Sequence, residues 1–227
     1  MILFHHIPKT AGSTFNHAVI KPNPNVSCLI GAGGIEARRP LVDLSTALYI
    51  GGHITYGESV RSGLADKAIR VTMIRDPIKR IVSHFEMAYR DNRIFREEIC
   101  GQDKWGSGFE VFYQRFISIA NINNIYCQYF SAKPRFYDAV VCLLSKFTVV
   151  ATVERFDDFQ ENVLNFFDDF GLNKLTDFVI KNVSSKSEKC DGLIDPKLIE
   201  KIRSNNEQDL RLFDWIESRH DGLYVRS

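Results

Sequence analysis

The sequence predicts an α/β fold in which helices cover both faces of a central parallel sheet. Short apolar segments rich in β-branched residues alternate with amphipathic segments of helical period along the chain, an order typical of parallel sheets. The chain has 227 residues, of which 44% are hydrophobic, enough to bury one sizeable core. We therefore expect residues 1–227 to form a single domain.

The first expected strand, within residues 1–7, leads directly into the loop Pro8-Lys9-Thr10-Ala11-Gly12-Ser13-Thr14. Residues 15–20 can continue this loop as a helix. A glycine-bearing loop between a strand and a helix directs backbone N–H groups and the positive helix end toward one point. The loop adds a lysine and three hydroxyl groups, so it is the first candidate anion site.

The next expected strands end in polar residues. Residues 26–30 form a weak strand, and residues 48–50 form a short apolar strand that places His53 at its carboxyl end. Residues 69–74 alternate and are rich in β-branched side chains, which indicates a central strand ending at Arg75. Ligands of open α/β sheets bind at this edge.

Helices are expected to follow these strands. Asp76 is suited to cap a helix that has Pro77 in its first turn. In that helix Lys79, Arg80 and Ser83 lie off the apolar face. Residues 91–108 are polar and glycine-punctuated, and we expect them to cross the active face. The remaining expected elements are helices at 109–122, 134–144, 156–170 (closed by Gly171) and 196–219 (capped by Asp195), and a strand at 147–153.

Bulk composition limits the function classes. Lys and Arg total 29 against 28 for Asp and Glu, so no overall charge attracts nucleic acid, and no nucleic-acid partner is expected. The five cysteines are widely spaced without a CxxC pair, which favours a reducing compartment. We expect no signal peptide, because the apolar stretch after Met1 is short, and no run approaches the ~20 apolar residues of a membrane helix. We expect a soluble cytoplasmic protein, or a Golgi-lumen protein if a membrane anchor precedes these residues.

A second segment with phosphate-binding character spans residues 74–85, Ile-Arg-Asp-Pro-Ile-Lys-Arg-Ile-Val-Ser-His-Phe. At this strand-to-helix junction Arg75 and Ser83 can converge on one phosphate. Together with the 8–14 loop, the segment resembles the two signatures of the sulfotransferases that use 3′-phosphoadenosine 5′-phosphosulfate (PAPS). The Pro-Lys-Thr start resembles the branch that contains heparan sulfate 2-O-sulfotransferase and related carbohydrate enzymes. The resemblance implies a P-loop-like three-layer fold.

The resemblance also implies roles for individual residues. Lys9 would contact the bridging and sulfonate oxygens of the co-substrate PAPS and stabilise the leaving phosphate. Arg75 and Ser83 would hold the 3′-phosphate, and Ser184 and Lys186 would close over the nucleotide. The residues that would hold the 5′-phosphate are Lys9, Thr10, Ala11, Gly12, Ser13 and Thr14. No metal is required by this scheme.

His53 is the candidate general base. The stretch Gly51-Gly52-His53 resembles the His-Gly-His of the 2-O-sulfotransferase branch, whose second histidine removes the acceptor proton. An ordinary imidazole pKa near ~6.5 suits this task. The chain departs from the pattern at Gly51, so acceptor handling can differ. Glu58 and Glu86 are weaker alternatives, while His5 and His6 are expected to pack in the core.

Other hypotheses remain open at this point. A P-loop kinase or hydrolase would carry its lysine after the glycine and an acidic magnesium partner. A non-catalytic member would bind nucleotide or glycan without turnover. The resemblance implies a hydroxyl acceptor on a carbohydrate, and the oligomeric state is not indicated. Two hypotheses also remain for five side chains. Lys79 and Arg80 can face an anionic acceptor or only solvent, and Trp105, Tyr113 and Tyr126 can stack on a ligand or only pack in the core.

Overall fold

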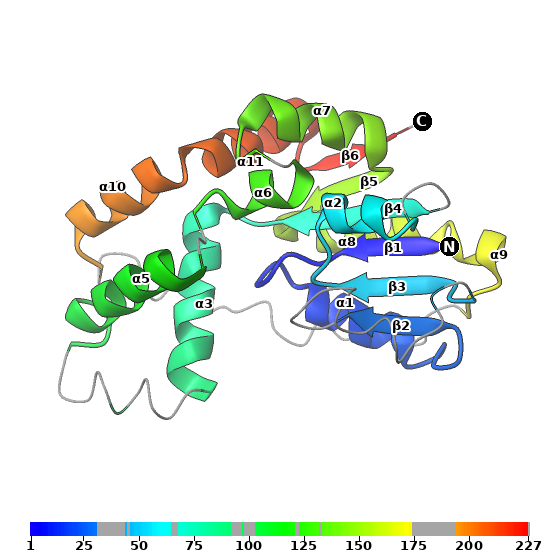
Figure 1. The fold of residues 1–227 in the computed structure, drawn as a ribbon, viewed down its shortest axis with the longest axis horizontal. Helices are drawn as coiled ribbons and strands as arrows, with labels where there is room; N and C mark the ends of the chain where they lie inside the picture. Colours follow the sequence, from blue (N-terminus) through cyan, green and yellow to red (C-terminus); the bar gives the residue numbers. More distant parts are fainter. Residues whose placement is uncertain are drawn as a thin grey trace.

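The fold is built around one six-stranded sheet with the strand order β2-β3-β1-β4-β5-β6 (Figure 1). The computed structural model describes residues 1–30, 44, 46–64, 68–91, 97, 103–120, 123–131, 133–173 and 194–226. The strands are β1 Ile2–His5, β2 Ser27–Ile30, β3 Tyr49–Gly52, β4 Ile69–Ile74, β5 Val149–Thr152 and β6 Leu223–Val225.

Strands β1 to β5 pair in parallel, which confirms the predicted parallel sheet. Strand β6 pairs antiparallel with β5 and was not predicted. It has three residues, Leu223 to Val225, which is too short for a recognisable alternation of apolar and polar positions. The parallel part of the sheet brings the carboxyl ends of its strands to one edge.

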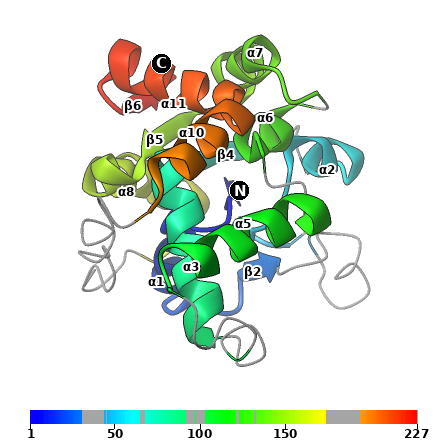
Figure 2. The same ribbon diagram turned by 90° about the vertical axis from the view of Figure 1, so that its left-hand side faces the viewer.

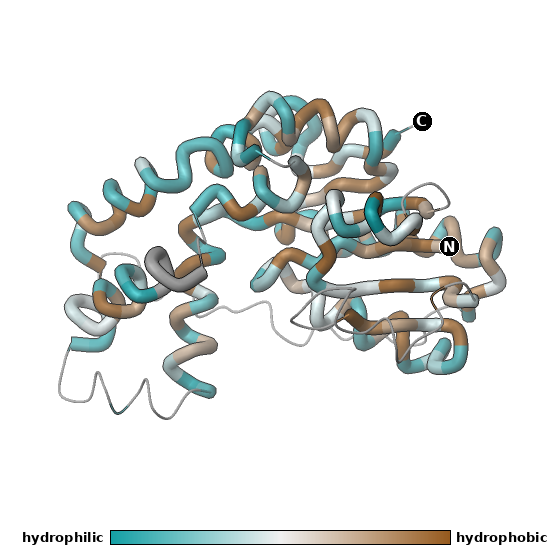
Figure 3. The backbone as a smooth tube through the Cα atoms, in the orientation of Figure 1, coloured by the Kyte–Doolittle hydropathy of each residue, from teal (hydrophilic) through white to brown (hydrophobic). Residues whose placement is uncertain are grey.

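Helices pack on both faces of the sheet, as predicted. Residues of β1 alternate between the two faces. Ile2 and Phe4 join the core cluster that contains side chains of α1 (Gly12–Ile20) and α8 (Phe156–Leu164), whereas Leu3 joins another cluster with residues of β2 and β3. Hydrophobic residues colour stretches of the strands brown in Figure 3. The helices around the sheet are α1 Gly12–Ile20, α2 Tyr56–Arg61, α6 Ile125–Phe130, α7 Phe136–Lys146, α8 Phe156–Leu164, α9 Phe167–Phe170 and α11 Glu207–His220.

Three further helices form a separate cluster beyond the carboxyl ends of the strands (Figures 1 and 2). They are α3 Pro77–Asp91, α5 Ser107–Ala120 and α10 Pro196–Asn205. Their shared core includes Ile81 and Phe85 of α3, Phe109 and Phe112 of α5 and Leu198 of α10. This cluster therefore faces the sheet edge where ligands of such folds bind.

Two predicted long helices are each divided in the structure. The segment 156–170 forms α8 and α9, and Gly171 ends α9 with a left-handed φ of 66°, as predicted. The segment 196–219 breaks at Asn206, whose side chain accepts a hydrogen bond from the backbone N–H of Asn124. Contacts with distant parts of the chain thus override the helical period.

The expected excursion over residues 91–108 lies largely outside the described residues. Within the part of the chain that the structure describes, no helix is both long and apolar enough to cross a membrane.

Candidate active site

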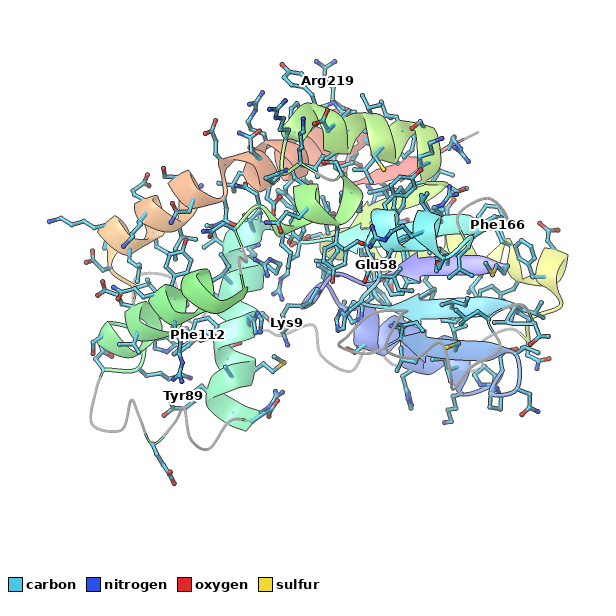
Figure 4. The ribbon with its side chains drawn as sticks, in the orientation of Figure 1. Lys9, Glu58, Tyr89, Phe112, Phe166 and Arg219 are labelled. Carbon is cyan, nitrogen blue, oxygen red and sulfur yellow. The ribbon has the colours of Figure 1, made fainter. Side chains whose placement is uncertain are left out.

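Three neighbouring strands in the middle of the sheet end at the predicted site residues. The order β3-β1-β4 places His53 directly after β3, the 8–14 loop after β1 and Arg75 directly after β4. Figure 4 shows Lys9 between this sheet edge and helix α3. Segments separated in the sequence are therefore brought to one edge by the parallel topology.

The 8–14 loop has the backbone geometry of an anion site. Lys9 and Ala11 adopt left-handed conformations with φ of 72° and 61°, which side-chain-bearing residues rarely occupy. Ala11 is the N-cap of α1 and provides no side-chain hydrogen bond, whereas Thr55 of α2 and Asp195 of α10 do. The first N–H groups of α1 thus lack the usual side-chain acceptor and suit an anionic ligand.

Thr10 contributes to the loop differently from the other hydroxyl residues. Its side chain is buried, and its Oγ1 donates a hydrogen bond of 2.8 Å to the carbonyl of Ile7. Only the backbone of Thr10 can therefore reach a ligand. The exposed Ser13 and the half-buried Thr14 are the loop hydroxyls that remain available.

Lys9 lies in a cationic environment. Desolvation lowers its pKa from the usual value, and the charges of Arg90 and Arg75 lower it further, while Asp91 and Glu86 oppose this effect. Positive charges that destabilise one another in this way are stabilised together by an anion. The environment of Lys9 therefore suits a phosphate or sulfonate group.

Arg75 is held in place by a tyrosine that the sequence did not reveal as a positioning residue. The buried hydroxyl of Tyr126 donates a 2.6 Å hydrogen bond to the Arg75 carbonyl and accepts one of 3.3 Å from the Arg75 N–H. Asp76 then caps α3 by accepting a 2.8 Å bond from the Lys79 N–H, as predicted. Ser83 is half-buried farther along the same helix.

The aromatic residues considered as stacking platforms pack elsewhere. Tyr126 and Tyr113 are completely buried, and the Tyr113 hydroxyl donates to Asn123 and accepts from Asn205. Trp105 packs edge-on against Phe85 in the three-helix cluster. These three residues therefore stabilise the structure, and the two tyrosines cannot stack on a ligand.

The two basic residues considered for an anionic acceptor also have other roles. Arg80 is completely buried, and its guanidinium lies 5.8 Å from the ring centre of Tyr126. Lys79 is exposed and forms an ion pair of 3.8 Å with Glu154. Arg80 therefore cannot face an acceptor, and a solvated position explains Lys79.

His53 has the tautomer that a base requires. Its Nδ1 lies 2.9 Å from the backbone carbonyl oxygen of His6. Because a carbonyl can only accept, Nδ1 must carry the hydrogen, and Nε2 then holds the lone pair. The half-buried His53 can thus accept a proton at Nε2 while its other nitrogen stays hydrogen-bonded.

The alternative bases differ in availability. The Glu58 carboxylate, near the start of α2 (Figure 4), accepts bonds of 2.8 Å from both the N–H and the hydroxyl of Thr55. This capping box engages Glu58 and makes it a poor base. Glu86 is half-buried on α3 and lies close enough to Lys9 to raise the pKa of that lysine.

His6 contacts His53, and Asn16 and Tyr49 extend this contact into the core in a way that sequence analysis did not predict. The burial expected for His5 and His6 is confirmed, but the ring of His6 also stacks on that of His53 with centroids 4.7 Å apart. The available signal was a pair of glycines, Gly12 and Gly51, that leave room for these side chains.

Two predicted residues, Ser184 and Lys186, lie outside the described residues. Among the described residues, no group of three or more His, Cys, Asp or Glu side chains is arranged to hold a metal ion.

Comparison with known protein families decides the class of this site. The model of the sulfotransferase family matches residues 1–215. The chain belongs to the sulfotransferase family. The predicted enzyme class is thereby confirmed, and the site described above is the candidate active site of a sulfotransferase.

Two further comparisons concern individual proteins. No curated protein matches the chain. Among solved structures, it is similar to mouse sulfotransferase SULT7A1 complexed with PAP, with 15% identity and a TM-score of 0.43 over 97% of this chain and 85% of that chain. That likeness is weak, and the assignment rests on the family match.

Proposed function

We propose that residues 1–227 form a single domain that transfers a sulfuryl group from PAPS to a carbohydrate hydroxyl. The observation that carries this proposal is the convergence of Lys9, His53 and Arg75 at the ends of three adjacent strands. An anion loop, a base with a lone pair on Nε2 and a second cation are the groups that sulfuryl transfer requires.

The donor would be held by groups on two strand-to-helix junctions. Backbone N–H groups of residues 10–14 at the α1 terminus would bind the 5′-phosphate. Arg75 and Ser83 would bind the 3′-phosphate, with Arg75 positioned by its two hydrogen bonds to Tyr126. The proposal that Ser184 and Lys186 close over the nucleotide rests on the family resemblance alone.

Lys9 and His53 would act on opposite sides of the transferred group. The acceptor oxygen forms a bond to sulfur while the bond from sulfur to the bridging phosphate oxygen breaks. His53 Nε2 takes the acceptor proton, and the electron pair of the broken bond leaves with 3′-phosphoadenosine 5′-phosphate (PAP). Lys9 stabilises the charge that develops on this leaving group. The proton on His53 is then released to solvent.

A carbohydrate acceptor is the finer part of the proposal. The position of His53 after β3 and the Pro-Lys-Thr start of the 8–14 loop support a relation to the heparan sulfate 2-O-sulfotransferase branch. Gly51 replaces the first histidine of that branch. The acceptor would therefore be a sugar hydroxyl whose recognition does not use a histidine at position 51.

The first test is calorimetric titration of PAP into the wild type and into Lys9→Ala, Arg75→Ala and Lys79→Ala. Loss of a charged hydrogen-bonding partner should weaken binding by about 10- to 100-fold for Arg75→Ala. Lys9→Ala should also weaken binding. Lys79→Ala is the matched control because this exposed lysine pairs with Glu154, and it should bind PAP like the wild type.

Acceptor turnover then tests the chemistry. His53→Ala should bind PAP normally and lose about 10²- to 10⁴-fold in kcat on a sugar acceptor. Absence of PAP binding to the wild type, with measurable binding of ATP and magnesium, would refute the proposal in favour of a nucleotide kinase. Tight PAP binding without turnover of any hydroxyl acceptor would instead indicate a non-catalytic nucleotide-binding protein.

A further inference from the structure

A row of buried polar side chains runs from the core to His53. The Tyr49 hydroxyl donates a 2.6 Å hydrogen bond to Asn16 Oδ1. Asn16 Nδ2 lies 3.4 Å from His6 Nδ1, and the His6 ring stacks on the His53 ring at 4.7 Å with an interplanar angle of 26°. Tyr49, Asn16 and His6 are 0%, 2% and 6% exposed, respectively.

Hydrogen-bond polarity in this row defines one tautomer of His6. Asn16 Oδ1 accepts from Tyr49, which directs the amide N–H groups of Asn16 toward His6. Because an amide nitrogen only donates, His6 Nδ1 must accept, and the ring hydrogen of neutral His6 is on Nε2. His53 carries its hydrogen on Nδ1, since that atom faces the His6 carbonyl. The two stacked rings therefore hold opposite tautomers.

His6 also stays neutral in this position. Burial lowers its pKa to about 3, with smaller contributions from the neighbouring His53 and Lys9. A cation on His6 would repel a proton on His53 and reduce its basicity. The neutral ring gives His53 a flat contact surface without this penalty.

The surrounding backbone leaves space for this row. A Cβ at Gly12 would overlap the His6 ring, and a Cβ at Gly51 would overlap Asn16 Oδ1. His6 also stacks on Phe4, with centroids 5.8 Å apart and planes 9° apart. The His6 ring is thus fixed between Phe4, the 8–14 loop and His53.

We propose that Tyr49, Asn16 and His6 are positioning residues. Tyr49 and Asn16 hold His6 as a neutral Nε2–H ring, and this ring orients His53 for proton abstraction. The catalytic part of this inference rests on the proposed function. The arrangement of ring hydrogens does not, because it follows from hydrogen-bond polarity in the free protein.

The first experiment measures ring nitrogens by NMR on ¹⁵N-histidine-labelled protein at pH 8, with signals assigned from His6→Phe and His53→Ala. The expected spectrum of the wild type shows the hydrogen of His6 on Nε2 and that of His53 on Nδ1. The double variant Tyr49→Phe/Asn16→Leu removes the polar groups of Tyr49 and Asn16 together, so neither of these two residues keeps an unpaired polar group. In this variant His6 should show a mixture of tautomers.

The second experiment separates stacking from general packing by kinetics. His6→Leu should lower kcat about tenfold because His53 loses its ring support, while His6→Phe should stay within about threefold of the wild type. Both variants should keep the Kd for PAP. Phe159→Leu is the control, since Phe159 packs on Phe4 in the same core, and it should keep kcat at a comparable loss of stability.

Each outcome has a definite consequence. A hydrogen on His6 Nδ1, or equal kcat losses in folded His6→Leu and His6→Phe, would overturn the positioning role. Wild-type kcat in His6→Leu would do the same. Absence of PAP binding and turnover in the wild type would refute the proposed function. The NMR spectra would still decide whether Tyr49 and Asn16 fix the tautomer of His6.

Discussion

At the scale of single residues, the packing around Gly51 explains why this position has no side chain. A Cβ at this position would overlap Asn16 Oδ1 and lie 2.7 Å from the Tyr49 hydroxyl. We expect Gly51→Ala to lower the free energy of unfolding by about 1–3 kcal/mol through overpacking. Urea denaturation measures this change.

The steric cause can be separated from a general loss of stability by a double-mutant cycle. An Asn16→Ala background removes the nearer of the two obstructing side chains and leaves the Tyr49 hydroxyl, so Gly51→Ala should cost less by about 0.5 kcal/mol or more. Phe130→Leu on the opposite face of the sheet is the control and should cost the same in both backgrounds. An unchanged cost of Gly51→Ala in the two backgrounds would contradict the steric account.

At the scale of elements, two helix caps of the same chemistry have different expected consequences. Asp76 caps α3 through the Lys79 N–H at 2.8 Å, and Asp195 caps α10 through the Lys197 N–H at 2.9 Å. Replacing either with Ala should cost about 1 kcal/mol of stability. Because α3 starts immediately after Arg75, only Asp76→Ala should also weaken PAP binding.

Comparing the two cap variants by thermal unfolding and by PAP titration checks this prediction. Asp195→Ala controls for the loss of a cap, since Asp195 starts α10 and not the helix that follows Arg75. Equal Kd values for PAP in the two variants would show that the start of α3 does not position Arg75.

The sequence predicted the elements whose signals are local. Short apolar strands ending at His53 and Arg75, the Asp76 and Asp195 caps and the loop after the first strand were all expected in their observed places. Their signals are apolar runs, capping residues and glycines within a few positions of one another. Parallel pairing then brings the strand ends to one edge without further information.

Features that depend on distant residues were not predictable. The helix break at Asn206 depends on its bond with Asn124, 82 positions away. The burial of Arg80 depends on Tyr126 and Asp209, and the contact of His6 with His53 joins two strands 47 positions apart. Helical period and residue type give no sign of such partners, because the pairs form only in the folded sheet.

At the scale of the whole molecule, buried ionisable groups couple stability to pH. Burial lowers the pKa of His5 to about 4, of His6 to about 3 and of His84 to about 4. Between these values and the ordinary value of 6.5, the unfolded chain binds protons that the folded protein does not. Each of these histidines therefore makes the free energy of unfolding fall as the pH falls below 6.5.

Asp209 acts in the opposite direction. Its buried carboxylate accepts hydrogen bonds from the N–H groups of Tyr126 and Cys127, yet desolvation raises its pKa from 3.8 to about 6. The folded protein therefore binds one proton here that the unfolded chain lacks between these pH values. Near pH 5 the three histidines outweigh Asp209, which leaves the unfolded chain with about two more bound protons.

The free energy of unfolding should consequently fall by about 3 kcal/mol per pH unit near pH 5, since each proton contributes about 1.4 kcal/mol per unit. Urea denaturation at intervals from pH 7 to pH 4.5 measures this slope. His84→Phe lowers by one the number of extra protons that the unfolded chain binds. It should therefore make the slope shallower by about 1.4 kcal/mol per pH unit. Asp209→Asn removes the opposing group and should make the slope steeper, whatever its effect on stability at pH 7. If both variants kept the wild-type slope, the acid sensitivity would have to come from groups other than these buried ones.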